Sequence, residues 1–120
     1  MSDFRDLQVY QKVFENAMLV FEMTKKFPTE EKYSLTSQIR KSSRSVCSSF
    51  GEGYRKRNYI KHFVAKVSDS DMENSESIVW LDFACACKYI PQREHNSMVS
   101  RFEEVGRMLN HVMVYPEKYI

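Results

Sequence analysis

The sequence predicts an all-α protein, an antiparallel up-down-up-down four-helix bundle that forms a single domain over residues 1–120. Along most of the chain, apolar residues recur at spacings of three and four, which is the period of one face of an α-helix. Only three Gly and three Pro occur, too few for the many turns of a β-protein. Short polar segments between the apolar stripes favour antiparallel neighbours.

The first helix is expected over residues 8–26. Asp6 is a candidate N-cap, because an aspartate side chain accepts hydrogen bonds from the free amides of the first turn. The helix should end before Pro28, since the residue that precedes a proline is disfavoured in the helical conformation. The expected apolar stripe consists of Tyr10, Val13, Phe14, Ala17, Val20 and Phe21.

The second helix is expected to begin near residues 31–34 and to end near residues 51–54. Gly51 and Gly53 indicate the end, because glycine enters the left-handed conformation of a helix stop without a Cβ penalty. Serines make one side of this helix unusually small, so a partner helix could approach it closely. The inward stripe consists of Leu35, Ile39, Ser42, Val46 and Ser49 or Phe50.

The third helix is expected from a cap at Asn58 to Tyr89 and Ile90. Its middle, residues 68–76, is acidic and polar except at Met72. Such a segment is either exposed to solvent or buried against polar partners. A solvated stretch is one alternative, because exposed ion pairs add little stability. We expect ion pairs with the cations of the antiparallel second helix, which are Arg40, Lys41 and Arg44.

The last helix is expected to start at Pro91, where the missing N–H is no loss, and to close at Pro116. Gly106 lies inside this helix, where glycine costs about 1 kcal/mol relative to alanine. We therefore expect close packing at Gly106.

Positive charge is concentrated in one part of the chain. The segment from Lys32 to Lys66 holds nine basic residues and one acid, a local charge of +8 in a chain of net charge +2. Such an uneven distribution of charge along the chain indicates a basic patch that binds an anionic partner. The alternative is a basic face that is only solvated. The candidate phosphate-binding residues are Arg40, Lys41, Arg44, Arg55, Lys56, Arg57 and Lys61.

Aromatic residues are interleaved with these cations. Aromatic side chains beside Arg and Lys can stack on unpaired bases while the cations contact phosphates. The alternative is that they cap the core, as aromatic residues at helix ends usually do. The aromatic residues concerned are Tyr33, Tyr54, Tyr59, Phe50 and Phe63.

The sequence lacks the usual residue patterns of metal sites, redox sites and catalytic sites. Cys47, Cys85 and Cys87 are odd in number and lack zinc or redox spacing, so we expect buried thiols. The histidines have no Glu-x-x-His neighbours, and Glu52 has no second titratable group at a suggestive spacing. We therefore expect no catalytic site, metal or cofactor. No apolar run is long enough to span a bilayer, and we expect a soluble, cytoplasmic protein.

Six motifs, spread in order over nearly the whole chain, carry a resemblance to a known family. They are Phe4–Lys12, Phe27-Pro28, Gln38–Ser42, Glu52-Gly53 with Tyr54-Arg55, Asp69-Ser70 with Glu73, and Gly106–Asn110. Together they resemble the four-helix-bundle family of 23S ribosomal RNA intervening-sequence proteins, related to accessory proteins of diversity-generating retroelements. The resemblance implies a barrel-shaped homopentamer. For the accessory proteins it also implies nucleic-acid binding and partnership with a reverse transcriptase.

Two hypotheses for function follow. The leading one is a non-catalytic homo-oligomer that binds RNA or DNA through its basic patch, in a largely sequence-independent and salt-dependent manner. The competing one is a protein-interaction scaffold, in which the same cations pair with the acidic segment of residues 69–76 in a neighbouring subunit.

Overall fold

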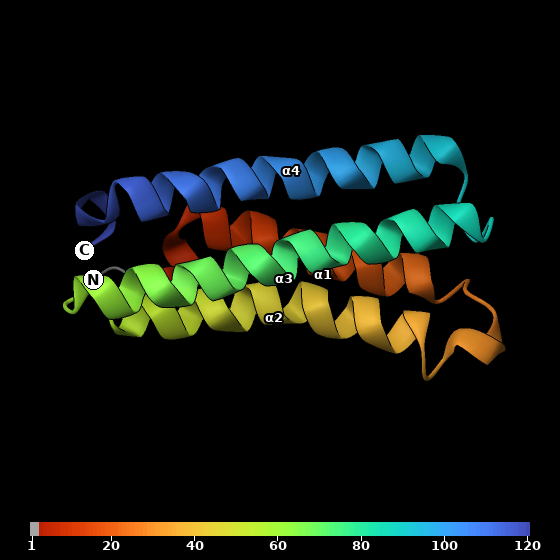
Figure 1. The fold of residues 1–120 in the computed structure, drawn as a ribbon, viewed down its shortest axis with the longest axis horizontal. Coiled ribbons are helices and arrows are strands. Elements are labelled where there is room, and N and C mark those ends of the chain that lie inside the picture. Colours follow the sequence, from red (N-terminus) through yellow and green to blue (C-terminus); the bar gives the residue numbers. More distant parts are fainter. Residues whose placement is uncertain (1–2) are drawn as a thin grey trace.

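The computed structural model describes residues 3–120, which form four long α-helices. Figure 1 shows these helices side by side, with the start of α1 and the end of α4 at the same end of a bundle that measures 44 × 25 × 23 Å. The predicted all-α four-helix bundle is confirmed. The helices are α1 (Gln8–Thr24), α2 (Leu35–Arg55), α3 (Ile60–Ala86) and α4 (Gln92–Val114), and short 3-10 helices cover Phe4–Asp6, Thr29–Glu31 and Pro116–Tyr119.

Each helix packs against two of the others. Helix α2 lies between α1 and α3, and α4 contacts the same two helices from the other side. Within residues 3–120, no Cα atom of α1 lies within 8 Å of one of α3, and the same holds for α2 and α4, so these pairs occupy opposite corners of the bundle. In the same part of the chain, no helix combines the length and apolarity needed to cross a membrane.

A polar layer divides the core. One apolar cluster includes Phe50 and Phe63, and the other includes Ile39 and Phe102. The side chains of the layer are almost completely buried, and their donors find neutral partners, as buried polar groups usually do, whereas Asn74 Oδ1 has no hydrogen-bond partner among the described residues. Ser70 Oγ donates to the carbonyl of Val46 (2.7 Å), Asn74 Nδ2 donates to the carbonyl of Phe102 (2.8 Å), and Ser42 and Ser77 share a hydrogen bond of 2.8 Å.

The predicted ion pairs from Arg40, Lys41 and Arg44 to the acidic segment of α3 are wrong. Within residues 3–120, none of these cations lies within 4.0 Å of a carboxylate. Ser70 and Asn74 of the segment face inward instead, and its acids Asp69 and Glu76 face solvent. A polar segment in a long helix can thus be buried without ion pairs.

The predicted helix stop at Gly51 and Gly53 is also wrong, because α2 continues through both to Arg55. Neither glycine has a positive φ. Both are buried, and a Cβ at residue 53 would lie 2.9 Å from the Cβ of Lys66 on α3. At Gly51 the nearest neighbour is the ring of Phe4, at 3.5 Å. These glycines allow close packing rather than chain reversal.

Helix α3 ends earlier than predicted, at Ala86 rather than near Tyr89. Lys88 adopts a left-handed φ of 66°. The amides of Lys88 and Tyr89 donate back to the carbonyls of Cys85 and Ala84, at 2.9 Å each. This is the pattern of a Schellman helix stop, here formed without the glycine that would have marked it in the sequence.

The predicted N-caps Asp6 and Asn58 are both wrong. Leu7 and Tyr59 occupy the cap positions of α1 and α3, and neither side chain makes a cap hydrogen bond. Asp6 instead accepts a hydrogen bond from the amide of Asp3 (3.1 Å) within the preceding turn. Helix α4 follows Pro91 as expected.

Substitution of Gly53 by alanine should destabilise the fold although alanine is the better helix former. The added Cβ would overlap the stem of Lys66, and overpacking costs about 1–3 kcal/mol. Gly106→Ala is the matched control, because its Cβ would meet Asn74 at an ordinary 3.5 Å, and it should be neutral or stabilising by up to about 1 kcal/mol. Urea denaturation followed by circular dichroism measures both. Equal effects would contradict close α2–α3 packing.

Candidate nucleic-acid interface

The structure separates the seven predicted site residues into two groups. Arg40, Lys41 and Arg44 lie in the first half of α2, whereas Arg55, Lys56, Arg57 and Lys61 surround its connection to α3. At 1.5 Å per residue, Arg44 and Arg55 are about 16 Å apart along the helix axis. The seven residues therefore form two adjoining clusters along one edge of the bundle.

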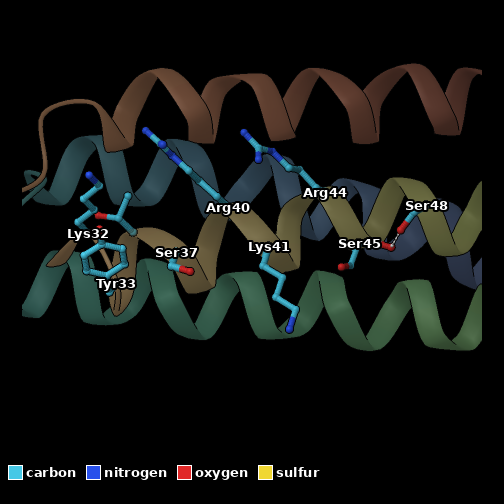
Figure 2. Close-up of a pocket in the computed structure, with 9 residues that line it drawn as sticks. Lys32, Tyr33, Ser37, Arg40, Lys41, Arg44, Ser45 and Ser48 are labelled. Carbon is cyan, nitrogen blue, oxygen red and sulfur yellow. Dashed lines mark hydrogen bonds between the residues drawn. The ribbon is translucent and has the colours of Figure 1, made fainter.

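The first group lines a shallow groove of about 610 Å³ on the outer side of α2. Figure 2 shows Arg40 and Arg44 extending toward α1, while Lys41 extends toward α3. On either side of these cations along α2, the lining includes the small side chains Ser37, Ser45 and Ser48. Long cations beside small hydroxyl groups leave an open strip that carries positive charge.

Contacts with α1 hold the two arginines in place. Arg40 Nε donates a hydrogen bond of 2.7 Å to Thr24 Oγ1. The guanidinium carbons of Arg40 and Arg44 lie 4.8 Å and 5.9 Å from the ring centroid of Phe21, within the range of cation–π attraction. Phe21, predicted as a core residue, is only half-buried. Phe21 and Thr24 thus hold the side chain of Arg40 in place and leave its Nη groups available to an anion.

A second hollow of about 400 Å³ continues the groove toward Arg55 and shares Arg44 and Ser48 with the first. Glu52 also lines it. The carboxylate of Glu52 pairs with Lys66 of α3 at 2.8 Å, and this hydrogen bond raises the pKa of Lys66. The negative charge of Glu52 in this hollow is therefore partly neutralised by Lys66.

The second group is only partly available. Arg57 Nη1 donates to the carbonyl of Tyr54 (3.0 Å), and its guanidinium carbon lies 4.3 Å from the centroid of the Tyr54 ring. The side chain of Arg57 thus satisfies a backbone carbonyl at the carboxyl end of α2. Arg55, Lys56 and Lys61 are exposed.

The aromatic residues divide in the same way. Phe50, Phe63 and Tyr54 are buried, so the core-capping interpretation holds for these three. Tyr33 and Tyr59 are exposed, each beside one of the basic clusters. Lys32, which was not among the predicted site residues, lines the groove together with Tyr33.

The cysteines differ from one another. Cys87 is exposed, contrary to the expectation of buried thiols, while Cys47 and Cys85 are half-buried. Burial raises the pKa of Cys47 to about 11. Within residues 3–120, no group of three or more His, Cys, Asp or Glu side chains is arranged to hold a metal ion.

Fold and site together define a four-helix bundle with a basic groove along one helix. A family model described as 23S rRNA-intervening sequence protein matches residues 5–111. The chain therefore belongs to the 23S rRNA-intervening sequence protein family. No curated protein matches the chain.

One solved structure of the same fold is a protein with unknown function from the S23 ribosomal protein family of Bacteroides thetaiotaomicron VPI-5482. It matches with a TM-score of 0.79 and 22% sequence identity, over 88% of this chain and 97% of that chain. At this identity the likeness shows the fold alone.

Native-state labelling with a thiol reagent at pH 8 should modify Cys87 much faster than Cys47. Thiolate is the reactive form, and the raised pKa of Cys47 from its ordinary value of 9.0 to about 11 lowers its thiolate fraction about a hundredfold. Cys87→Ser should remove the fast phase, and Cys47→Ser should leave it unchanged. Loss of the fast phase in Cys47→Ser would show that this thiol is open to solvent.

Proposed function

We propose that this protein is a non-catalytic, homo-oligomeric nucleic-acid-binding protein whose α2 groove contacts phosphates. The observation that carries the proposal is the set of three cations, Arg40, Lys41 and Arg44, gathered on one open face. Within residues 3–120 none of them has an ion-pair partner within 4.0 Å. A hollow lined by charge of one sign raises the local concentration of a ligand of opposite charge.

The composition of the groove supports binding without catalysis. Its lining between Lys32 and Ser48 consists of cations, hydroxyl side chains and one tyrosine, and it includes no carboxylate, histidine or cysteine. Such a lining offers ionic contacts and hydrogen bonds to phosphate oxygens, which position a nucleic acid without reading its sequence. Of the side chains that usually serve in general acid–base catalysis, the groove offers only lysine and tyrosine.

Two exposed apolar faces support assembly into a ring. Phe14 on α1 is 51% exposed and Met72 on α3 is 67% exposed. Met18 lies beside Phe14, while Val79 and Phe83 continue the Met72 face. Because α1 and α3 occupy opposite corners of the bundle, the α1 face of one subunit can join the α3 face of the next. Such a head-to-tail contact closes into a ring when the rotation between subunits allows it.

The heights of the two faces agree with this arrangement. Asn16 of α1 donates to the carbonyl of Arg101 (3.2 Å), and Asn74 of α3 donates to the carbonyl of the next residue, Phe102 (2.8 Å). Asn16 and Asn74 therefore lie at one level, and Phe14 and Met72 each precede them by two residues. In such a ring the outer side of α2 stays uncovered. The family resemblance extends the proposal to five subunits and to a reverse transcriptase as a partner enzyme.

Neutralising the groove should weaken binding of duplex DNA and of structured RNA alike. In the variant with Arg40, Lys41 and Arg44 changed to Gln, loss of about three phosphate contacts should reduce the slope of log affinity against log salt by about 2.7 units on DNA. Affinity at low salt should fall at least about tenfold. Fluorescence anisotropy across a salt series measures both quantities.

The matched control removes the same charge from the opposite corner of the bundle, with Arg93, Arg107 and Lys118 changed to Gln. This control should bind like the wild type. If both variants lose the same affinity, net charge rather than the groove is responsible, and the proposal fails. If the groove variant instead falls apart into monomers by light scattering, the cations pair with acids of a neighbouring subunit, as the scaffold hypothesis requires.

Assembly can be tested by blocking one face at a time. Phe14→Glu and Met72→Glu should each dissociate the oligomer, because each places a charge in an apolar contact. An equimolar mixture should then form a heterodimer, since the intact α1 face of Met72→Glu still fits the intact α3 face of Phe14→Glu. Mass photometry or light scattering measures the particle mass.

Val114→Glu is the control for this experiment, because Val114 is also an exposed apolar residue but lies on α4. It should leave the oligomer intact. Two monomeric variants that do not combine on mixing would rule out a head-to-tail contact between the α1 and α3 faces.

A further inference from the structure

Tyr33 is the most exposed of the large hydrophobic side chains in the described part of the chain, with 85% of its surface accessible to solvent. It lies at the end of the groove and forms part of its lining, next to the basic residues (Figure 2). A side chain with so little burial adds almost nothing to the core. In contrast, Tyr54, which caps the core, is 4% exposed.

The backbone around Tyr33 is held firmly. The carboxylate of Glu31 accepts hydrogen bonds from the hydroxyl of Tyr89 (2.7 Å) and from the amide of Leu35 (3.2 Å). The amide of Ser34 donates to the carbonyl of Glu31 (3.0 Å). The turn that carries Tyr33 is thus tied to α2 and to the end of α3, and the exposed ring is presented from a rigid support.

One cation lies beside the open ring, and others follow along the groove. Lys32 Nζ lies 5.4 Å from the centroid of the Tyr33 ring. Arg40, Lys41 and Arg44 follow along α2, and at 1.5 Å per residue Arg44 is about 14 Å along the axis from Leu35, where α2 begins. An aromatic platform followed by a line of cations is the arrangement that binds single strands, in which bases stack and phosphates follow the positive groove.

We propose that the α2 groove selects unpaired nucleic acid over duplex, with Tyr33 stacking on an exposed base and the cations from Arg40 to Arg44 holding the phosphates beside it. This inference rests on the proposed function and names the class of its substrate. A duplex presents its phosphates but keeps its bases stacked on one another, so it can use the cations and not the tyrosine. Stacking does not depend on base identity, because every base has a π-face.

The test compares an unstructured oligothymidine with a DNA hairpin duplex that has the same number of phosphates. Wild-type protein should bind the single strand more tightly. Tyr33→Ala should weaken single-strand binding roughly five- to one-hundred-fold, with no change in the salt slope, because stacking is not ionic. Hairpin binding should be unchanged. Tyr33→Phe, which keeps the ring and loses the hydroxyl, should bind the single strand like the wild type.

Tyr115→Ala is the matched control, because Tyr115 is also an exposed tyrosine with a lysine over its ring, Lys118 at 4.6 Å, but lies at the end of α4. It should have no effect. Equal binding of strand and hairpin, unchanged in Tyr33→Ala, would overturn the inference and leave the phosphate-binding function standing. A change of oligomer mass in Tyr33→Ala would assign Tyr33 to a protein contact and would also overturn it. Absence of binding to both probes at low salt would overturn the proposed function itself.

Discussion

The close approach of α2 to α3 is the constraint on which the rest of the structure depends. It requires small residues on the inward side of α2, where Gly53 leaves no room for a side chain beside Lys66 and Ser42 shares a hydrogen bond with Ser77. Residues three and four apart share one side of a helix. The long cations of α2 therefore fall on its other sides, outside the core, and form one open basic face.

The polar layer in the core complements this arrangement. Its hydroxyl groups and the amide nitrogen of Asn74 are paired with one another and with backbone carbonyls, and only Asn74 Oδ1 lacks a partner among the described residues, so the layer is formed without buried charge. Buried ion pairs often cost more in desolvation than they return, and a core that avoids them leaves its cations free. Because Lys41 and Arg44 make no ion pair in the described part of the chain, the groove can bind a ligand without breaking an ion pair of the fold.

Sequence patterns predicted the four helices well and their ends less well. Periodicity is a property of many residues together, and it identified the inward stripe of α2 correctly from Leu35 to Phe50. A helix end depends on a few residues whose conformation is decided by their surroundings. Gly53 therefore continued a helix that it was expected to stop, and Lys88 formed a left-handed stop for which glycine is the usual signal.

For the candidate site, the sequence by itself determined which segment is basic and which residues share a side of α2, because charge and helical period are local properties. Only the tertiary structure decided that Arg40 packs against Phe21 and Thr24 and that Arg57 packs against Tyr54. It also decided which tyrosines are exposed to solvent. Exposure and contact depend on which helices pack together and at what height. That packing joins residues far apart in the chain, and no local pattern records it.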